Sequence, residues 1–267
     1  MRQTVQALVV LLILGSCAAL ILPAVVKVRE SGRRMECANN LRQIGLSVGN
    51  YQDSNQGRYP AAAMPSPELS PENGPYSVSL MLNGQLPTEK RLGWLVDLIP
   101  YIEQDNIYRR IDKKKGWDAE ENRFAALLAC KLFHCPGYPE GPPASTLWPS
   151  HYVGITGVGE GAAWLPSGDR RAGFFGYDRT LYKKDLVRGE SQTAMATETS
   201  AAQGAWTAAG PATVRGYDPA TAHFGGNHCG GCQVGFADGS VRFIDAKISE
   251  AEWVRMVVLA ADDTPRE

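Results

Sequence analysis

The strongest pattern in the chain is an uncharged apolar run near the amino terminus. No charged side chain occurs from Thr4 to Val26, and most of these positions are aliphatic. A run of this length is sufficient to cross a bilayer as a helix, in which Pro23 would introduce a kink near the far end. The run therefore predicts a transmembrane segment at about 4–26. A cleaved signal peptide and a lipoprotein signal ending at Cys17 are the alternatives.

The helix is predicted to continue beyond the apolar run. Apolar side chains recur there at spacings of four and three, at Cys37, Leu41, Ile44, Val48 and Tyr51. This spacing is typical of a helix that buries one face. A glycine signal at Gln56-Gly57 predicts the end of the helix. Residues 1–57 are thus interpreted as a helical spine and residues 58–267 as a globular domain.

The globular domain is predicted to be α+β. Residues 76–82 alternate as in a short strand, residues 95–108 follow helical spacing with a kink at Pro100, and residues 120–132 resemble a second helix. Ser249 and Glu252 form a capping-box pattern that opens a final helix. Short apolar segments between glycines predict an antiparallel sheet, with strands at 152–155, 173–176, 194–197, 234–237 and 241–244. We expect this sheet to pack on the spine, with helices at the periphery.

Composition narrows the range of functions. The 267 residues carry 27 Lys and Arg against 28 Asp and Glu, so the formal net charge is -1. Such a balance gives no field that favours nucleic acid, and no nucleic-acid partner is predicted. The 28 glycines and 17 prolines indicate a folded body with many loops.

A histidine and a hairpin signal form the most conspicuous candidate site. His228 is followed after nine residues by Asp238-Gly239, and residues 228–244 are interpreted as one hairpin unit. Asp-Gly between apolar segments predicts a two-residue turn with positive φ at both positions. His228 is expected to order its glycine-rich loop through hydrogen bonds to backbone. Because no nucleophile or catalytic metal motif accompanies this pair, the chain is not predicted to be an enzyme, and a zinc-dependent enzyme is the remote alternative.

The chemical role of the cysteines can be interpreted in several ways. Cys130 and Cys135 are four residues apart, and Cys229 and Cys232 are two apart. Structural disulfides are the first interpretation, because an exported domain is oxidised. A zinc site, with His134 and His228 as substitute ligands, is the second, and redox catalysis is a distant third. Calcium is a further alternative, carried by scattered acidic residues without EF-hand spacing that we interpret as surface groups: Asp169, Asp178, Asp185, Glu190 and Glu198. No cofactor is therefore predicted.

Several motifs resemble a known family. Residues 22–25 (LPAV), 29–45 (RESGRRMECANNLRQIG) and Tyr59-Pro60, together with the spacing from His228 to Asp238-Gly239, are similar to bacterial proteins with a type IV prepilin-type amino terminus and a carboxyl-terminal H-X9-DG motif. The resemblance covers nearly the whole chain. It implies a pilin-like fold, with other pilin-like subunits or secretion-system components as partners.

One position departs from that family. Gln6 stands where the family carries a glutamate, which is thought to neutralise the free amino terminus of a neighbouring subunit. A neutral amide cannot form this ion pair, and the glycine-phenylalanine cleavage junction is absent. A homopolymeric filament is therefore not expected, whereas entry into a filament as a rare subunit and processing of the amino terminus are left open.

The sequence thus predicts a non-catalytic, membrane-anchored, pilin-like envelope protein. The basic residues that follow the span, among them Lys27 and Arg29, favour a cytoplasmic domain by the positive-inside rule. The resemblance implies the opposite orientation, and we expect a single-pass inner-membrane protein whose domain lies outside the cytoplasm. A lipid-anchored or secreted solute-binding module is the alternative.

Overall fold

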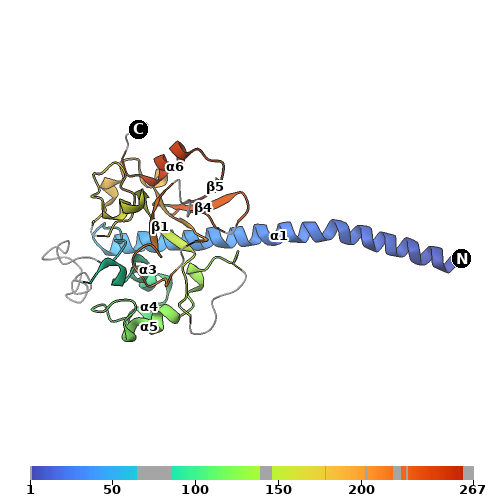
Figure 1. The fold of residues 1–267 in the computed structure, drawn as a ribbon, viewed down its shortest axis with the longest axis horizontal. Helices are drawn as coiled ribbons and strands as arrows, with labels where there is room; N and C mark the ends of the chain where they lie inside the picture. The colour runs from blue at the N-terminus through green and yellow to red at the C-terminus, as the bar shows by residue number, and fades with distance from the viewer. Residues whose placement is uncertain are drawn as a thin grey trace.

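A long helix dominates the protein, whose structure is a computed structural model describing residues 2–64, 86–138, 146–177, 179–201, 204–218, 224–226 and 228–260. Helix α1 (Arg2–Ser54) has 53 residues. Its amino-terminal half projects from the body and its carboxyl-terminal half runs through it (Figure 1). The helix ends with Gln56 and Gly57 at φ of 58° and 80°, where the Gly57 amide donates to the Gln52 carbonyl at 2.9 Å. The predicted glycine end is confirmed.

The predicted membrane span, 4–26, lies in the projecting half of α1. Its side chains at residues 4, 5, 7–10, 13 and 18 lie outside the described residues. Among the side chains that are described, no helix reaches the length and apolarity needed to cross a bilayer. Large apolar side chains in this half are nonetheless exposed by 58% to 75%: Leu11, Leu12, Leu14, Leu20, Ile21 and Leu22.

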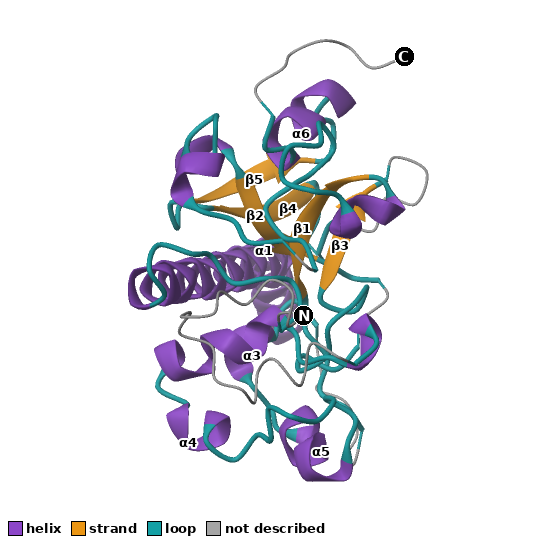
Figure 2. Ribbon diagram, turned by 90° about the vertical axis from the view of Figure 1, so that its left-hand side faces the viewer, coloured by secondary structure: helices purple, strands orange, loops and turns teal. Residues whose placement is uncertain are grey.

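The carboxyl-terminal half of α1 lies between two layers. Cys37, Leu41, Ile44 and Val48 are fully buried and Tyr51 nearly so, which confirms the predicted apolar stripe. The sheet lies on one side of the helix, and α3 lies on the other, with α4 and α5 beyond it (Figure 2). The middle of α1 is therefore part of the core of the domain.

The peripheral helices are shorter than predicted. They are α3 (Trp94–Leu98), α4 (Asp105–Tyr108), α5 (Glu120–Leu127) and α6 (Glu250–Val257), with 3₁₀ turns η2 (Thr88–Lys90), η3 (Ile99–Ile102), η4 (Lys131–Phe133), η5 (Glu160–Trp164), η6 (Lys183–Asp185) and η7 (Glu190–Gln192). Pro100 lies in η3, where the α-helix tightens into a 3₁₀ turn, and the left-handed Glu103 separates η3 from α4. The predicted capping box of α6 is present, since Ser249 Oγ accepts from the Glu252 amide at 3.3 Å.

The sheet is mixed rather than antiparallel. Its strands are β1 (Tyr152–Val158), β2 (Ala194–Glu198), β3 (Val214–Tyr217), β4 (Gly231–Phe236) and β5 (Val241–Asp245), and their order in the described sheet is β3-β1-β2-β4-β5. β3, which the sequence analysis missed, runs parallel to β1.

One predicted strand is not formed, and another falls outside the described residues. Residues 173–176 form no regular strand; Gly173 and Phe175 instead donate to the carbonyls of Thr156 and Ile155 in β1, at 2.7 and 2.9 Å. Because β3 pairs with the same strand, this segment has no free edge along which to extend a ladder. The predicted strand at 76–82 lies outside the described residues.

The two faces of the sheet have different partners. Gly235 lies against Leu41 of α1, since a Cβ at this glycine would lie 3.6 Å from Leu41 Cδ2. On the opposite face, Val234 and Phe236 pack with Trp253 and Val257 of α6. The layers are therefore the short helices, α1, the sheet and α6 (Figures 1 and 2).

Candidate metal centre

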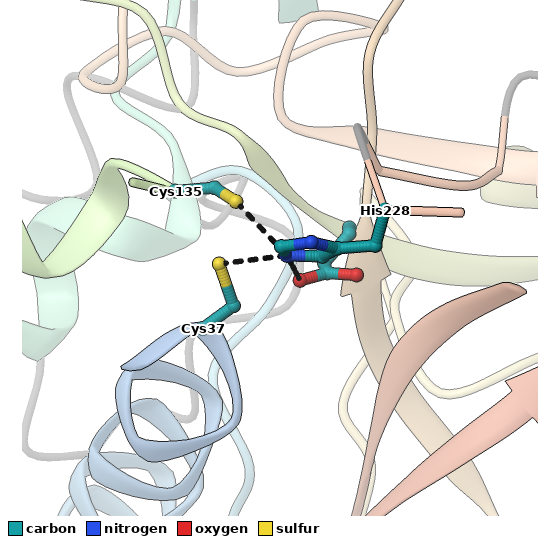
Figure 3. Close-up of side chains that lie close together, drawn as sticks. Cys37, Cys135 and His228 are labelled. Atoms are coloured by element: carbon teal, nitrogen blue, oxygen red, sulfur yellow. Dashed lines mark hydrogen bonds and ion pairs between the residues drawn. The ribbon is translucent and has the colours of Figure 1, made fainter. Parts of the chain in front are cut away.

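Four potential metal ligands from distant parts of the chain meet beside α1. They are Cys37 on α1, Cys135 after η4, Glu198 at the end of β2 and His228 before β4, and their ligand atoms all lie within 4.8 Å of one another. His228 Nε2 is 3.2 Å from Cys37 Sγ and 3.5 Å from Cys135 Sγ. Figure 3 shows both sulfur atoms directed at the His228 ring.

The cluster is closed to solvent. Cys37, Cys135 and Glu198 are fully buried, and so is the His228 side chain. Glu198 Oε2 accepts a hydrogen bond from the Gln233 amide at 2.8 Å. Glu198 Oε1 makes no hydrogen bond of good geometry and lies 3.4 Å from His228 Nε2. A buried carboxylate oxygen without a donor is costly, so a cation is expected to face it.

Further groups hold the ligands in place. Glu30, two turns before Cys37 on α1, places Oε1 2.8 Å from His228 Nδ1. This contact orients the imidazole with Nε2 toward the cluster. The Gly137 amide donates to Cys135 Sγ at 3.4 Å. Three of the four side chains therefore have a partner outside the cluster that fixes their orientation.

Without a metal, protons balance the charges of the cluster. The Glu198 carboxylate, together with Cys37 and Glu30, raises the pKa of His228 to about 10, although burial opposes this. The hydrogen bond with Cys135, and then burial, raise the pKa of the Cys37 thiol above its usual range. Partial burial favours a higher pKa for Glu30, but with the hydrogen bond to His228 the net effect is a lowered pKa. The acidic side chains on either side of the His228 ring thus favour its protonated form.

His228 differs from its predicted role. Its ring contacts carboxylates and thiols rather than the backbone of its own loop, because α1 passes beside it. The turn also differs: the Phe236 amide donates to the Ser240 carbonyl and Gly239 donates back to Phe236, so the loop has three residues. Gly239 has the predicted positive φ of 79°, but Asp238 does not. Asp238 instead accepts hydrogen bonds from the amide and hydroxyl of Ser240.

The remaining predicted cysteines do not join the cluster. All six cysteines are free, so the predicted disulfides are not present. Cys130 and Cys232 are buried elsewhere, and Cys229 is exposed in the turn before β4, whereas Cys232 lies within β4. His134, the other proposed substitute ligand, lies beside Trp148 and His151.

Two of the four side chains in the cluster were not predicted as metal ligands from the sequence. Cys37 was interpreted as a member of the apolar stripe, and its spacing carries no other signal. Glu198 was interpreted as a surface residue, but it is fully buried at the end of β2. A carboxylate at the end of the predicted strand 194–197 was the available signal. The other acidic residues do not gather with Glu198, and Asp178 lies outside the described residues.

Comparison with known protein families identifies the family of this chain. A family model described as "Protein of unknown function (DUF1559)", SBP_bac_10, matches residues 26–217. The chain belongs to this family. The DUF1559 match includes Cys37, Cys135 and Glu198 and ends before His228. It does not extend to Gln6, an exposed residue of α1, or to the H-X9-DG motif, so the prepilin-type amino terminus and that motif stay predictions. No curated protein and no solved structure matches the chain.

Proposed function

We propose that this DUF1559 protein is a non-catalytic cell-envelope protein, held at the membrane by the projecting half of α1, with its globular domain outside the cytoplasm. The observation that carries the proposal is the exposed apolar surface of this half, where the described leucine and isoleucine side chains from 11 to 22 are exposed by 58% or more. The sequence from 4 to 26 also carries no charge. A water-exposed helix of this composition is unfavourable, and lipid or a neighbouring pilin-like helix would cover it.

The free energy gained by burying these apolar side chains supports attachment of α1 to the membrane. Burying one leucine or isoleucine side chain contributes about 1.5–3 kcal/mol. The six exposed residues between 11 and 22 would together contribute on the order of 10 kcal/mol when they enter an apolar environment. The closed ligand cluster supports a structural rather than catalytic domain, because its four side chains are shielded from any substrate.

Attachment is tested by placing charges on the projecting half. Leu14 and Leu20 are exposed by 60% and 75%, so a Leu14→Lys, Leu20→Lys variant should fold normally and leave the membrane fraction. Leu46→Lys is the matched control, since Leu46 is equally exposed on the half of α1 that crosses the domain. The measurement is the share of protein that stays in the membrane pellet after an alkaline wash. Equal retention of the two variants would contradict the proposal.

Orientation is tested with the exposed thiol of Cys229. A membrane-impermeant maleimide should label this cysteine in cells whose outer envelope has been opened while the inner membrane stays intact. Cys229→Ser should abolish the labelling. Labelling that appears only after the inner membrane is broken would place the domain in the cytoplasm.

Solute capture is the second candidate function. A cavity of about 650 Å³ lies between α1 and the segments around η3 and η4, with Gln43, Tyr101 and Trp206 in its lining. This volume lies in the range of small-molecule sites. Calorimetric titration with amino acids and sugars, repeated with Gln43→Trp, tests it: binding that the substitution abolishes would support solute capture.

A further inference from the structure

The buried cluster next to α1 carries an inference that is independent of membrane attachment. We propose that Cys37, Cys135, Glu198 and His228 bind one structural Zn²⁺ ion. Two thiolates, an imidazole and a carboxylate are the ligand types that zinc takes in proteins, whereas magnesium and calcium prefer oxygen ligands alone.

The distances agree with tetrahedral coordination. With zinc–sulfur bonds of about 2.3 Å and zinc–nitrogen bonds of about 2.0–2.1 Å, neighbouring ligand atoms of a tetrahedron lie about 3.3–3.8 Å apart. His228 Nε2 lies 3.2 Å from Cys37 Sγ, 3.5 Å from Cys135 Sγ and 3.4 Å from Glu198 Oε1. The remaining pairs of ligand atoms lie within 4.8 Å of one another, so the ligands would draw inward by up to about 1 Å per pair to hold one ion at the centre.

A proton satisfies the cluster less well than a metal ion. The hydrogen on His228 Nδ1 points to Glu30, so Nε2 has one hydrogen for Cys37 Sγ, Cys135 Sγ and Glu198 Oε1, and the two thiols add only their weak S–H donors. A disulfide between Cys37 and Cys135 would leave Glu198 Oε1 as it is, without a hydrogen bond. A divalent cation contacts every one of these atoms at once.

The outer contacts are those of a zinc site. A histidine ligand usually donates its second ring nitrogen to a carboxylate, and Glu30 Oε1 lies 2.8 Å from His228 Nδ1. The Gly137 amide donates to Cys135 Sγ, and the Gln233 amide donates to Glu198 Oε2. Four protein ligands and full burial leave no open coordination position, which is the arrangement of structural rather than catalytic zinc.

The ion would join α1 to the sheet. Its ligands come from α1, β2 and two loops that are far apart in the sequence, so one bound ion closes several long loops. Metal binding of this kind contributes directly to folding stability. The long helix and the domain would then move as one body.

Metal content of the full-length protein is the first test. Protein purified in detergent with zinc supplied should hold about one zinc per chain, and cobalt exchanged into it should show the intense visible bands of tetrahedral thiolate coordination. Cys135→Ser should lose both signals. Cys130→Ser and the Cys229→Ser, Cys232→Ser double variant are controls that should keep them, because these cysteines lie outside the cluster.

Glu30→Gln tests the positioning of His228. This variant keeps all four ligands but loses the charge that faces His228 Nδ1, so zinc affinity measured against a competing chelator should fall roughly 10-fold to 100-fold. Arg42→Gln, a change at an exposed residue of the same helix that bonds to Asn39, should leave the affinity unchanged.

Three outcomes would overturn the zinc site. They are wild-type protein that stays free of zinc and gives no cobalt spectrum, zinc retained in full by Cys135→Ser, and an intact mass two hydrogens below the reduced value that maps to a Cys37–Cys135 disulfide. The first and third concern the wild type, so they decide the matter even where a variant fails to fold. Membrane retention is measured separately and fails or succeeds independently of them.

Discussion

The contact between Gly45 and Gly239 allows a sharp test of how the hairpin sits on the helix. A Cβ built at Gly45 would lie 2.8 Å from Gly239 Cα and 3.6 Å from its carbonyl carbon. Both partners are backbone atoms, so neither can rotate away as a side chain would. The Gly45→Ala substitution must therefore push the β4–β5 turn away from α1.

The magnitude follows from two opposing effects. Alanine is better than glycine in a helix by about 1 kcal/mol. Carbon atoms prefer separations of about 3.5–4.0 Å, so the turn must move by about 1 Å, and overpacking of this kind costs about 1–3 kcal/mol. Gly49→Ala is the matched control, because its Cβ would meet nothing within 4 Å. Helix propensity cancels between the two variants, and Gly45→Ala should be less stable than Gly49→Ala by about 1–3 kcal/mol.

The assay is urea unfolding of the full-length protein, followed by fluorescence of buried tryptophans such as Trp94 and Trp206. The free energies of unfolding of the two variants are compared at equal m-values. If Gly45→Ala proves as stable as Gly49→Ala, the turn is not seated on α1 as described. The same result would remove the packing reason for a glycine at position 45, whereas Gly239 would keep the positive φ of 79° that favours glycine there.

Two further predictions concern a buried acid and the amino terminus. Burial raises the pKa of Asp97 to about 7, and Lys113 offsets only part of this. The unfolded chain loses this proton near pH 4, so the free energy of unfolding should fall from about pH 4 to pH 7. Asp97→Asn should flatten this pH profile and raise the free energy of unfolding by roughly 1–3 kcal/mol at pH 8. If the urea midpoints of the variant and the wild type depend on pH with the same slope, the buried acid does not control stability in this way. Neutral Gln6 should prevent homopolymeric filaments, and abundant filaments of this protein alone in electron micrographs of overexpressing cells would contradict that expectation.

Local features of the chain were predictable because they depend on neighbours in sequence. The stripe from Cys37 to Tyr51 follows from helical periodicity, and the end of α1 follows from the left-handed conformation that Gly57 adopts readily. The capping box at Ser249 is likewise a relation between residues three apart. Each of these needs only one helix and the residues that flank it.

The sheet and the ligand cluster depended on tertiary structure. β3 pairs with β1 across more than fifty residues, and its four residues, which include Arg215 and Gly216, carry no apolar pattern that predicts a strand or its direction. Cys135 and His228 were singled out from the sequence, but their partners Cys37 and Glu198 were not identified as ligands. A cysteine in an apolar stripe and a carboxylate at a strand end acquire a shared chemistry only when the fold brings them within 4.8 Å. Hydrophobic periodicity is a local property, whereas convergence of ligands depends on how distant elements pack, and this is why only the folded structure reveals the centre.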